Sequence, residues 1–69
     1  MSVSEVKYPE ISVQLVGQDG NAMSIIASVT RALRKGGVLK SEIDEFVNEA
    51  MSGDYDHLLR TAMQTVEVY

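Results

Sequence analysis

Apolar residues recur at helical spacing in three stretches of this 69-residue chain. The spacing i, i+3, i+4, i+7 gathers apolar side chains on one face of a helix. It predicts helices over about 22–35, 41–51 and 55–65, which together can enclose one core. The three apolar faces comprise Ile25, Ile26, Val29, Ala32 and Leu33; Ile43, Phe46, Val47, Ala50 and Met51; and Tyr55, Leu58, Leu59, Ala62, Met63 and Val66.

Two further segments alternate apolar and polar residues, as a half-buried strand does. In the first, 11–16, the residues Ile11, Val13 and Leu15 share one side, and the second is 66–69. We expect the two segments to pair, because a lone short strand leaves its backbone groups without partners. The prediction is a mainly helical α+β fold in the order β-α-α-α-β, with a three-helix core and a two-stranded sheet from the chain ends.

Polar residues and glycines mark the expected helix ends. Asn21 and Asp54 stand where an N-cap side chain can accept a hydrogen bond from the first free amides of a helix. Ser41 is the expected N-cap of the middle helix, with Asp44 three residues later in a variant of the capping box. The pair Gly36-Gly37 is expected to close the first helix, because glycine adopts the left-handed conformation without a steric penalty.

The remaining residues, 1–10, mix polar and charged types around Pro9 without a sustained period. We interpret them as a flexible lead-in and residues 11–69 as a single small domain. So small a core supplies limited stability, and small proteins often add disulfides, a metal or a second subunit. With no cysteine and with His57 as the one histidine, the chain can form no disulfide and no common zinc cluster. We therefore expect a homodimer, with no cofactor or metal.

The formal net charge of −4 narrows the possible partners. An acidic chain opposes the non-specific attraction that nucleic acid phosphates exert on Lys and Arg. No apolar run approaches the roughly 20 residues that cross a bilayer, and no basic stretch leads into an apolar segment as in a secretion signal. The absence of cysteine is typical of a reducing compartment. We expect a cytoplasmic protein that does not contact a membrane.

Two clusters offer weak signals of chemistry. The turn Gly17–Asn21 precedes a helix N-terminus, where backbone amides can bind a phosphate, but it lacks the residues of a P-loop and contains the anionic Asp19. We interpret it as a turn with a cap. Asp54, Asp56 and His57 could suggest acid–base or metal chemistry, but acids in a first helical turn are expected from the helix dipole. We expect His57 on an exposed flank, and we predict that the chain is not an enzyme.

Arg31, Arg34, Lys35 and Lys40 surround the glycine pair and form a local positive patch on an acidic chain. We name these four residues the basic turn and take them as the candidate partner-binding residues. The first three also complement the negative end of the helix dipole. A helix-turn-helix reading is disfavoured, because the second helix is acidic and would face phosphates. The basic turn of one subunit could instead meet the acidic helix of another.

Methionines and aromatic residues complete the list of candidates. Met23, Met51 and Met63 are expected to fill gaps in the core, although flexible methionines also suit adaptable binding surfaces. The aromatic residues are too scattered to form a platform on which bases stack; they include Phe46, Tyr55 and Tyr69.

The segments 15–22 (LVGQDGNA) and 52–59 (SGDYDHLL) together resemble a family of short hypothetical proteins found in bacterial genomes, phages and plasmids. The resemblance covers about 11–68, although Met23 and Thr65 stand where larger aromatic residues are expected in relatives. It implies no catalytic residue, but a mobile-element setting fits an accessory or regulatory role. We therefore predict a non-enzymatic interaction protein, with a nucleic-acid-binding accessory protein as the alternative.

Overall fold

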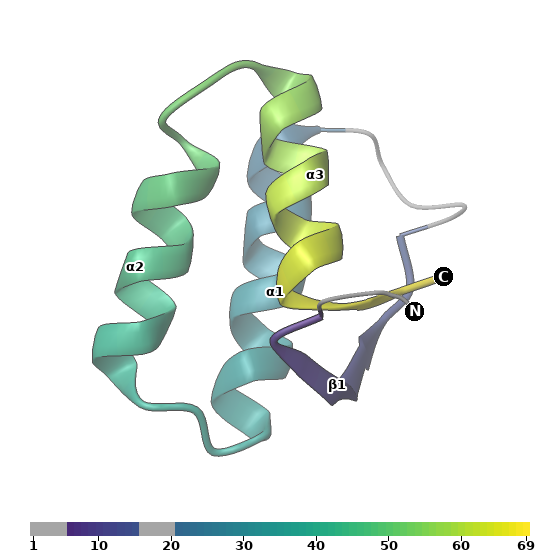
Figure 1. Cartoon of the computed structure of the whole chain (residues 1–69), viewed down its shortest axis with the longest axis vertical. Coiled ribbons are helices and arrows are strands. Elements are labelled where there is room, and N and C mark those ends of the chain that lie inside the picture. The colour runs from purple at the N-terminus through teal and green to yellow at the C-terminus, as the bar shows by residue number, and fades with distance from the viewer. Residues whose placement is uncertain (1–5, 16–20) are drawn as a thin grey trace.

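Three helices follow one another between two short strands in the part of the chain that the computed structural model describes, residues 6–15 and 21–69 (Figure 1). The mainly helical α+β fold and its order β-α-α-α-β are therefore confirmed. None of these helices is long and apolar enough to cross a bilayer. The elements are β1 (Tyr8–Val13), α1 (Ala22–Lys35), α2 (Lys40–Ala50), α3 (Tyr55–Thr65) and β2 (Val66–Val68).

The helices enclose a core built from the predicted apolar faces. In Figure 1, α2 runs opposite to α1 and α3, so that the α1–α2 turn and the α2–α3 turn lie at opposite ends of the bundle. Val29, Leu33 and Ala62 have no exposed surface. Two residues of β1 and one of β2 complete the core from the side of the sheet. The buried apolar residues are Ile11, Val13, Ile25, Ile26, Val29, Leu33, Ile43, Phe46, Ala50, Leu58, Ala62 and Val66.

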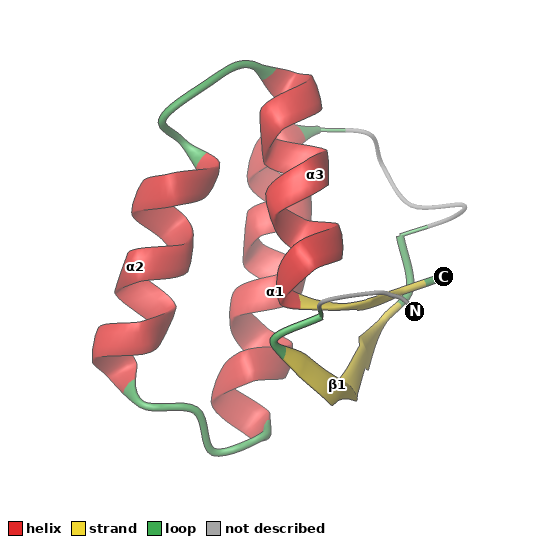
Figure 2. Cartoon of the chain, in the orientation of Figure 1, coloured by secondary structure: helices red, strands yellow, loops and turns green. Residues whose placement is uncertain are grey.

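The two strands pair as predicted, and they run parallel (Figure 2). Parallel neighbours need a long connection, which the three helices supply. The strand begins earlier than expected: β1 starts at Tyr8 and not at Ile11, so residues 8–10 belong to the sheet and not to a lead-in. The register is irregular between Tyr8 and Ser12. Because Pro9 has no amide hydrogen to donate, an irregular stretch of an edge strand can accommodate it.

Two of the expected N-caps are confirmed and one is wrong. Asn21 Oδ1 accepts from the amide of Met23 at 2.8 Å, and Asp54 Oδ1 accepts from the amide of His57 at 2.9 Å. Ser41 is not the cap of α2, because the helix already begins at Lys40 and its N-cap is Leu39, which makes no side-chain hydrogen bond. The Leu39 carbonyl instead accepts the amides of the first turn.

The glycine pair ends α1, with the two glycines in different conformations. Gly36 is the C-cap with a φ of −80°, and Gly37 takes the left-handed conformation with a φ of 84°. The amide of Val38 then bonds to the Leu33 carbonyl at 3.0 Å. The chain can therefore reverse direction and start α2 within a few residues.

The methionine prediction is wrong. Met23, Met51 and Met63 are 63%, 58% and 53% exposed. They occupy the margins of the helical faces, where the neighbouring elements end or turn away. The core is closed by branched aliphatic side chains, alanines and Phe46, and it leaves these methionines on the surface.

Candidate functional site

The basic turn lies at one end of the helix bundle. Arg31, Arg34 and Lys35 come from the last turns of α1, and Lys40 is the first residue of α2. All four side chains belong to exposed residues. Among the residues that the structure describes, Lys40 is the one of the four with an ion pair, since its Nζ lies 3.1 Å from Asp44 Oδ2. Three positive charges therefore remain available to a partner.

A groove runs between α1 and α2 beside the basic turn, with a volume of about 310 Å³. Arg34 and Lys40 flank it, and aliphatic side chains form much of its surface. Thr30 also lines the groove, and its Oγ1 is buried and makes no hydrogen bond within the described residues. A buried hydroxyl without a hydrogen bond destabilises the folded state by about 1–3 kcal/mol, so the Thr30 hydroxyl is an unusual polar group in this groove. The lining residues are Thr30, Arg34, Val38, Lys40, Ile43, Asp44 and Val47.

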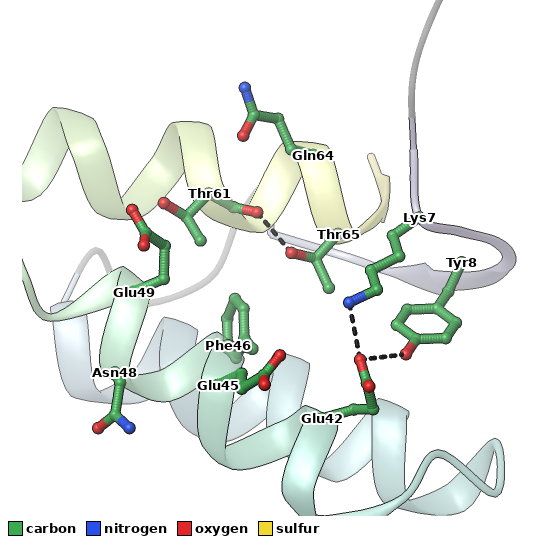
Figure 3. Close-up of a pocket in the computed structure, with 10 residues that line it drawn as sticks. All are labelled: Lys7, Tyr8, Glu42, Glu45, Phe46, Asn48, Glu49, Thr61, Gln64 and Thr65. Carbon is green, nitrogen blue, oxygen red and sulfur yellow. Dashed lines mark hydrogen bonds and ion pairs between the residues drawn. The ribbon is translucent and has the colours of Figure 1, made fainter.

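A second and larger groove, of about 850 Å³, lies where α2, α3 and the start of β1 meet (Figure 3). Figure 3 shows Lys7 and Tyr8 converging on Glu42 from the opposite wall. Lys7 Nζ lies 2.7 Å from Glu42 Oε1, and the Tyr8 hydroxyl donates to the same oxygen at 3.3 Å. These contacts join β1 to α2, so they have a structural role. Glu45 and Glu49 leave the α2 side of this groove acidic.

The shared contact also shifts three pKa values. The hydrogen bond from Lys7 lowers the pKa of Glu42, and the same hydrogen bond raises the pKa of Lys7. Partial burial, followed by the charge of Glu42, raises the pKa of Tyr8. Each shift favours the charge state that keeps the contact at neutral pH, so the groove is fixed by this link and not poised for proton transfer.

In the cluster at the start of α3, made of Asp54, Asp56 and His57, the His57 side chain connects α3 to the end of α2. His57 is half-buried and not on an exposed flank, because its ring reaches back to the end of α2. His57 Nε2 lies 2.9 Å from both the carbonyl and a carboxylate oxygen of Glu49, and 3.2 Å from Ser52 Oγ. The Glu49 oxygens accept only, so Nε2 carries the proton and donates it. It is therefore not placed to take a proton from Ser52.

The other sequence candidates do not assemble into a site. Asp54 is occupied as the cap of α3. Asn21 is a cap too, while residues 17–20 of the turn Gly17–Asn21 lie outside the described residues. Within the described part of the chain, no group of three His, Asp or Glu side chains is placed to hold a metal ion.

Leu39 and Thr30 are the residues that sequence reasoning missed. Leu39 is 70% exposed in the middle of the basic turn, and Thr30 lines the groove with a buried hydroxyl. The sequence does not show whether a leucine in front of a helix is exposed, and it does not show whether a threonine within a helix is buried. Both roles depend on how α1 and α2 pack.

Comparison of the chain with protein-family models, with curated proteins and with solved structures gives no match. The resemblance to short hypothetical proteins of bacteria, phages and plasmids therefore stays a prediction. The geometry of the surface alone bears on function.

Proposed function

We propose that this protein is a non-enzymatic interaction or regulatory module that forms a homodimer through a charged helical surface. The observation that carries the proposal is the segregation of charge around α2. At one end of the bundle lie Arg31, Arg34 and Lys35, three cations that form no ion pair with any residue of 6–15 or 21–69. The polar side of α2 presents acids, and these are Glu42, Asp44, Glu45 and Glu49.

Such a distribution supports association between copies of the chain. Complementary patches steer two molecules together and fix their register, and they do so without a deep pocket. The small core supports the same conclusion, since a second subunit would add buried apolar surface. A partner protein with an acidic surface could use the same cations.

Light scattering across a dilution series tests the proposal. We expect a dimer that dissociates on dilution, and we expect the triple variant R31E/R34E/K35E to dissociate at much higher concentration. The matched control is Arg60→Glu, which reverses an exposed cation on α3 outside the basic turn. A wild-type chain that stays monomeric at every concentration, or a triple variant that dimerises as well as the control, would contradict the proposal.

The alternative proposal is a nucleic-acid-binding accessory protein that uses the same cations. It is supported by the three cations that lack ion pairs, because phosphates prefer such groups. The acidic surface of α2, which directly follows the basic turn, would repel phosphates and so argues against this alternative. Fluorescence anisotropy of labelled DNA and RNA at low salt separates the two: binding that R31E/R34E/K35E abolishes and Arg60→Glu retains would favour the alternative.

A further inference from the structure

Leu39 is the N-cap residue of α2, a position at which leucine contributes little to the stability of the fold. The N-cap of a helix favours Asn, Asp or Ser, whose side chains accept a hydrogen bond from a free amide. Leu39 makes no such bond and is 70% exposed. It therefore contributes neither a cap nor much burial to its own fold. Conflicts of this kind with local preference are typical of functional positions.

The opposite end of the bundle holds an apolar hollow of about 250 Å³. Ala22 and Met23 at the start of α1, Ala50 and Met51 at the end of α2, and the first turns of α3 line it. A cavity of about 150 Å³ can hold a benzene ring, so this hollow has room for a leucine side chain. Its margin is adaptable, because two exposed methionines form part of it. The lining residues are Ala22, Met23, Ile26, Ala50, Met51, Gly53, Asp54, Tyr55 and Leu58.

The charges around the two features are complementary. Leu39 lies among cations, with Lys40 beside it and Arg34 and Lys35 across the glycine turn. The hollow is lined in part by Asp54, and Asp56 follows in the first turn of α3. Leu39 and the hollow are separated by the length of α2, whose eleven residues span roughly 16 Å. Leu39 precedes the first residue of α2 and the hollow includes its last residue, Ala50, so the two features are placed to join different molecules and not to meet within one.

We infer that Leu39 of each copy inserts into the methionine-edged hollow of the other copy in a two-fold symmetric dimer, with each basic turn seated against Asp54 and Asp56 of the other copy. This inference rests on the proposed self-association and names the surface that receives the basic turn. The apolar side chain supplies burial at the centre of the contact, and the charged residues form its rim, as in other protein interfaces.

Variants can disable each side of the contact separately. Leu39→Asn removes the inserted side chain without changing charge, and it supplies a favoured N-cap, so the variant will fold. The double variant M23K/M51K places charges at two exposed positions of the hollow. Met63→Lys is the matched control, because Met63 is 53% exposed on α3 and does not line the hollow. The self-dissociation constant of each is measured by sedimentation equilibrium at low salt.

We expect Leu39→Asn and M23K/M51K each to raise the self-dissociation constant at least about tenfold, and Met63→Lys to leave it unchanged. An equimolar mixture of Leu39→Asn and M23K/M51K should form a 1:1 heterodimer more tightly than either variant dimerises alone, because the mixed dimer regains one of the two contacts, between Leu39 of M23K/M51K and the intact hollow of Leu39→Asn. Unchanged association of both variants would overturn the inference. If R31E/R34E/K35E still dissociated the protein in that case, the proposed self-association would stand. A monomeric wild-type chain would overturn both.

Discussion

At the scale of single residues, three threonine hydroxyls differ in their hydrogen bonding: two donate to a carbonyl, and one is buried without a partner among the described residues. Thr61 and Thr65 in α3 each donate a hydroxyl proton to a backbone carbonyl one turn earlier, at 2.8 and 2.7 Å. Thr30 in α1 is buried at its oxygen and has no such bond within the described residues. The same residue type therefore has opposite effects on stability at the two places.

Thr30→Val should raise the free energy of unfolding by about 1 kcal/mol, because it removes an unpaired buried hydroxyl and keeps the shape of the side chain. Thr65→Val is the matched control, and it should lower the free energy of unfolding by about 1 kcal/mol, because it deletes a hydrogen bond. Urea denaturation measures both. Changes of the same sign in the two variants would show that the Thr30 hydroxyl does have a partner in solution.

A methyl group at position 53 should be costly. A Cβ built on Gly53 would lie 2.8 Å from Cγ of the His57 ring, closer than side chains approach one another. Gly53→Ala should therefore lower the free energy of unfolding by about 1–3 kcal/mol, as overpacking does. In a His57→Gly background, which removes both the ring and the His57 Cβ that would lie 2.9 Å away, the same change should cost much less. A double-mutant cycle by thermal denaturation measures this coupling, and equal costs in both backgrounds would contradict it.

At the scale of elements, helix starts and the junction of β1 with α2 decide stability. Side chains cap α1 and α3, whereas α2 begins without one. The start of β1 is tied to α2 through the contact of Lys7 and Tyr8 with Glu42. A capping side chain at the start of α2 would therefore add stability. The contact of Lys7 with Glu42 depends on the protonation of Glu42.

Leu39→Asp should raise the free energy of unfolding by about 0.5–2 kcal/mol, because a carboxylate at the N-cap accepts a free amide of α2. Asn21→Ala, the reverse change at the start of α1, should lower the free energy of unfolding by about 1 kcal/mol. Urea denaturation of dilute protein keeps association out of the comparison. A loss of stability in Leu39→Asp would show that Leu39 contributes burial within the monomer.

The contact of Lys7 with Glu42 should give stability a specific dependence on pH. The folded pKa of Glu42 is lowered, so its contribution is complete above the usual glutamate value of about 4.3 and is lost as the pH falls through the lowered value. The Tm difference between wild type and Glu42→Gln should be constant from about pH 5 to 8 and shrink below about pH 4. The control is Glu67→Gln on β2, and the same trend in that variant would contradict the assignment.

At the scale of the whole molecule, opposite charges lie at different places on a small surface. The basic turn stands at one end of the bundle, and acids occupy the polar side of α2 and the first turn of α3. The total charge of −4 conceals this separation. A patch that attracts a second copy must therefore be sought in the arrangement of charges and not in their sum.

Association between such patches should weaken with salt. Exposed charges are screened over about 10 Å at 0.1 M ionic strength and over about 3 Å at 1 M. The self-dissociation constant of the wild-type chain should therefore rise several-fold between about 0.05 and 0.5 M salt, by sedimentation equilibrium. R31E/R34E/K35E should lose most of this dependence. Tighter association at high salt would show that apolar contact alone holds the subunits together.

The apolar pattern predicted most of the fold because periodicity reports directly on burial. Val29 and Leu33 in α1, and Leu58 and Ala62 in α3, lie in the core as their spacing requires. Asn21 and Asp54 cap helices because the relevant hydrogen bonds lie within three residues in sequence. Local chemistry of this kind needs no knowledge of neighbouring elements.

The predictions that failed concern the margins of elements. Met23 and Met51 continue an apolar face but project beyond the place where the next helix packs, so spacing alone could not show that they are exposed. Ser41 has the right chemistry for a cap, but the N-cap of α2 lies two residues earlier, at Leu39. The lead-in predicted over residues 1–10 contains Pro9, whereas the structure includes Pro9 in β1, where the pairing is irregular.

Three helices, two of their caps, the pairing of the end segments and the position of the basic turn could all be predicted from the amino-acid order, because each follows from contacts close in sequence or from burial with a fixed period. Packing in three dimensions was needed to establish that the strands run parallel, that Lys7 meets Glu42, and that Leu39 and the methionine-edged hollow lie at opposite ends of α2. These features depend on which faces meet in space, and no local preference specifies that.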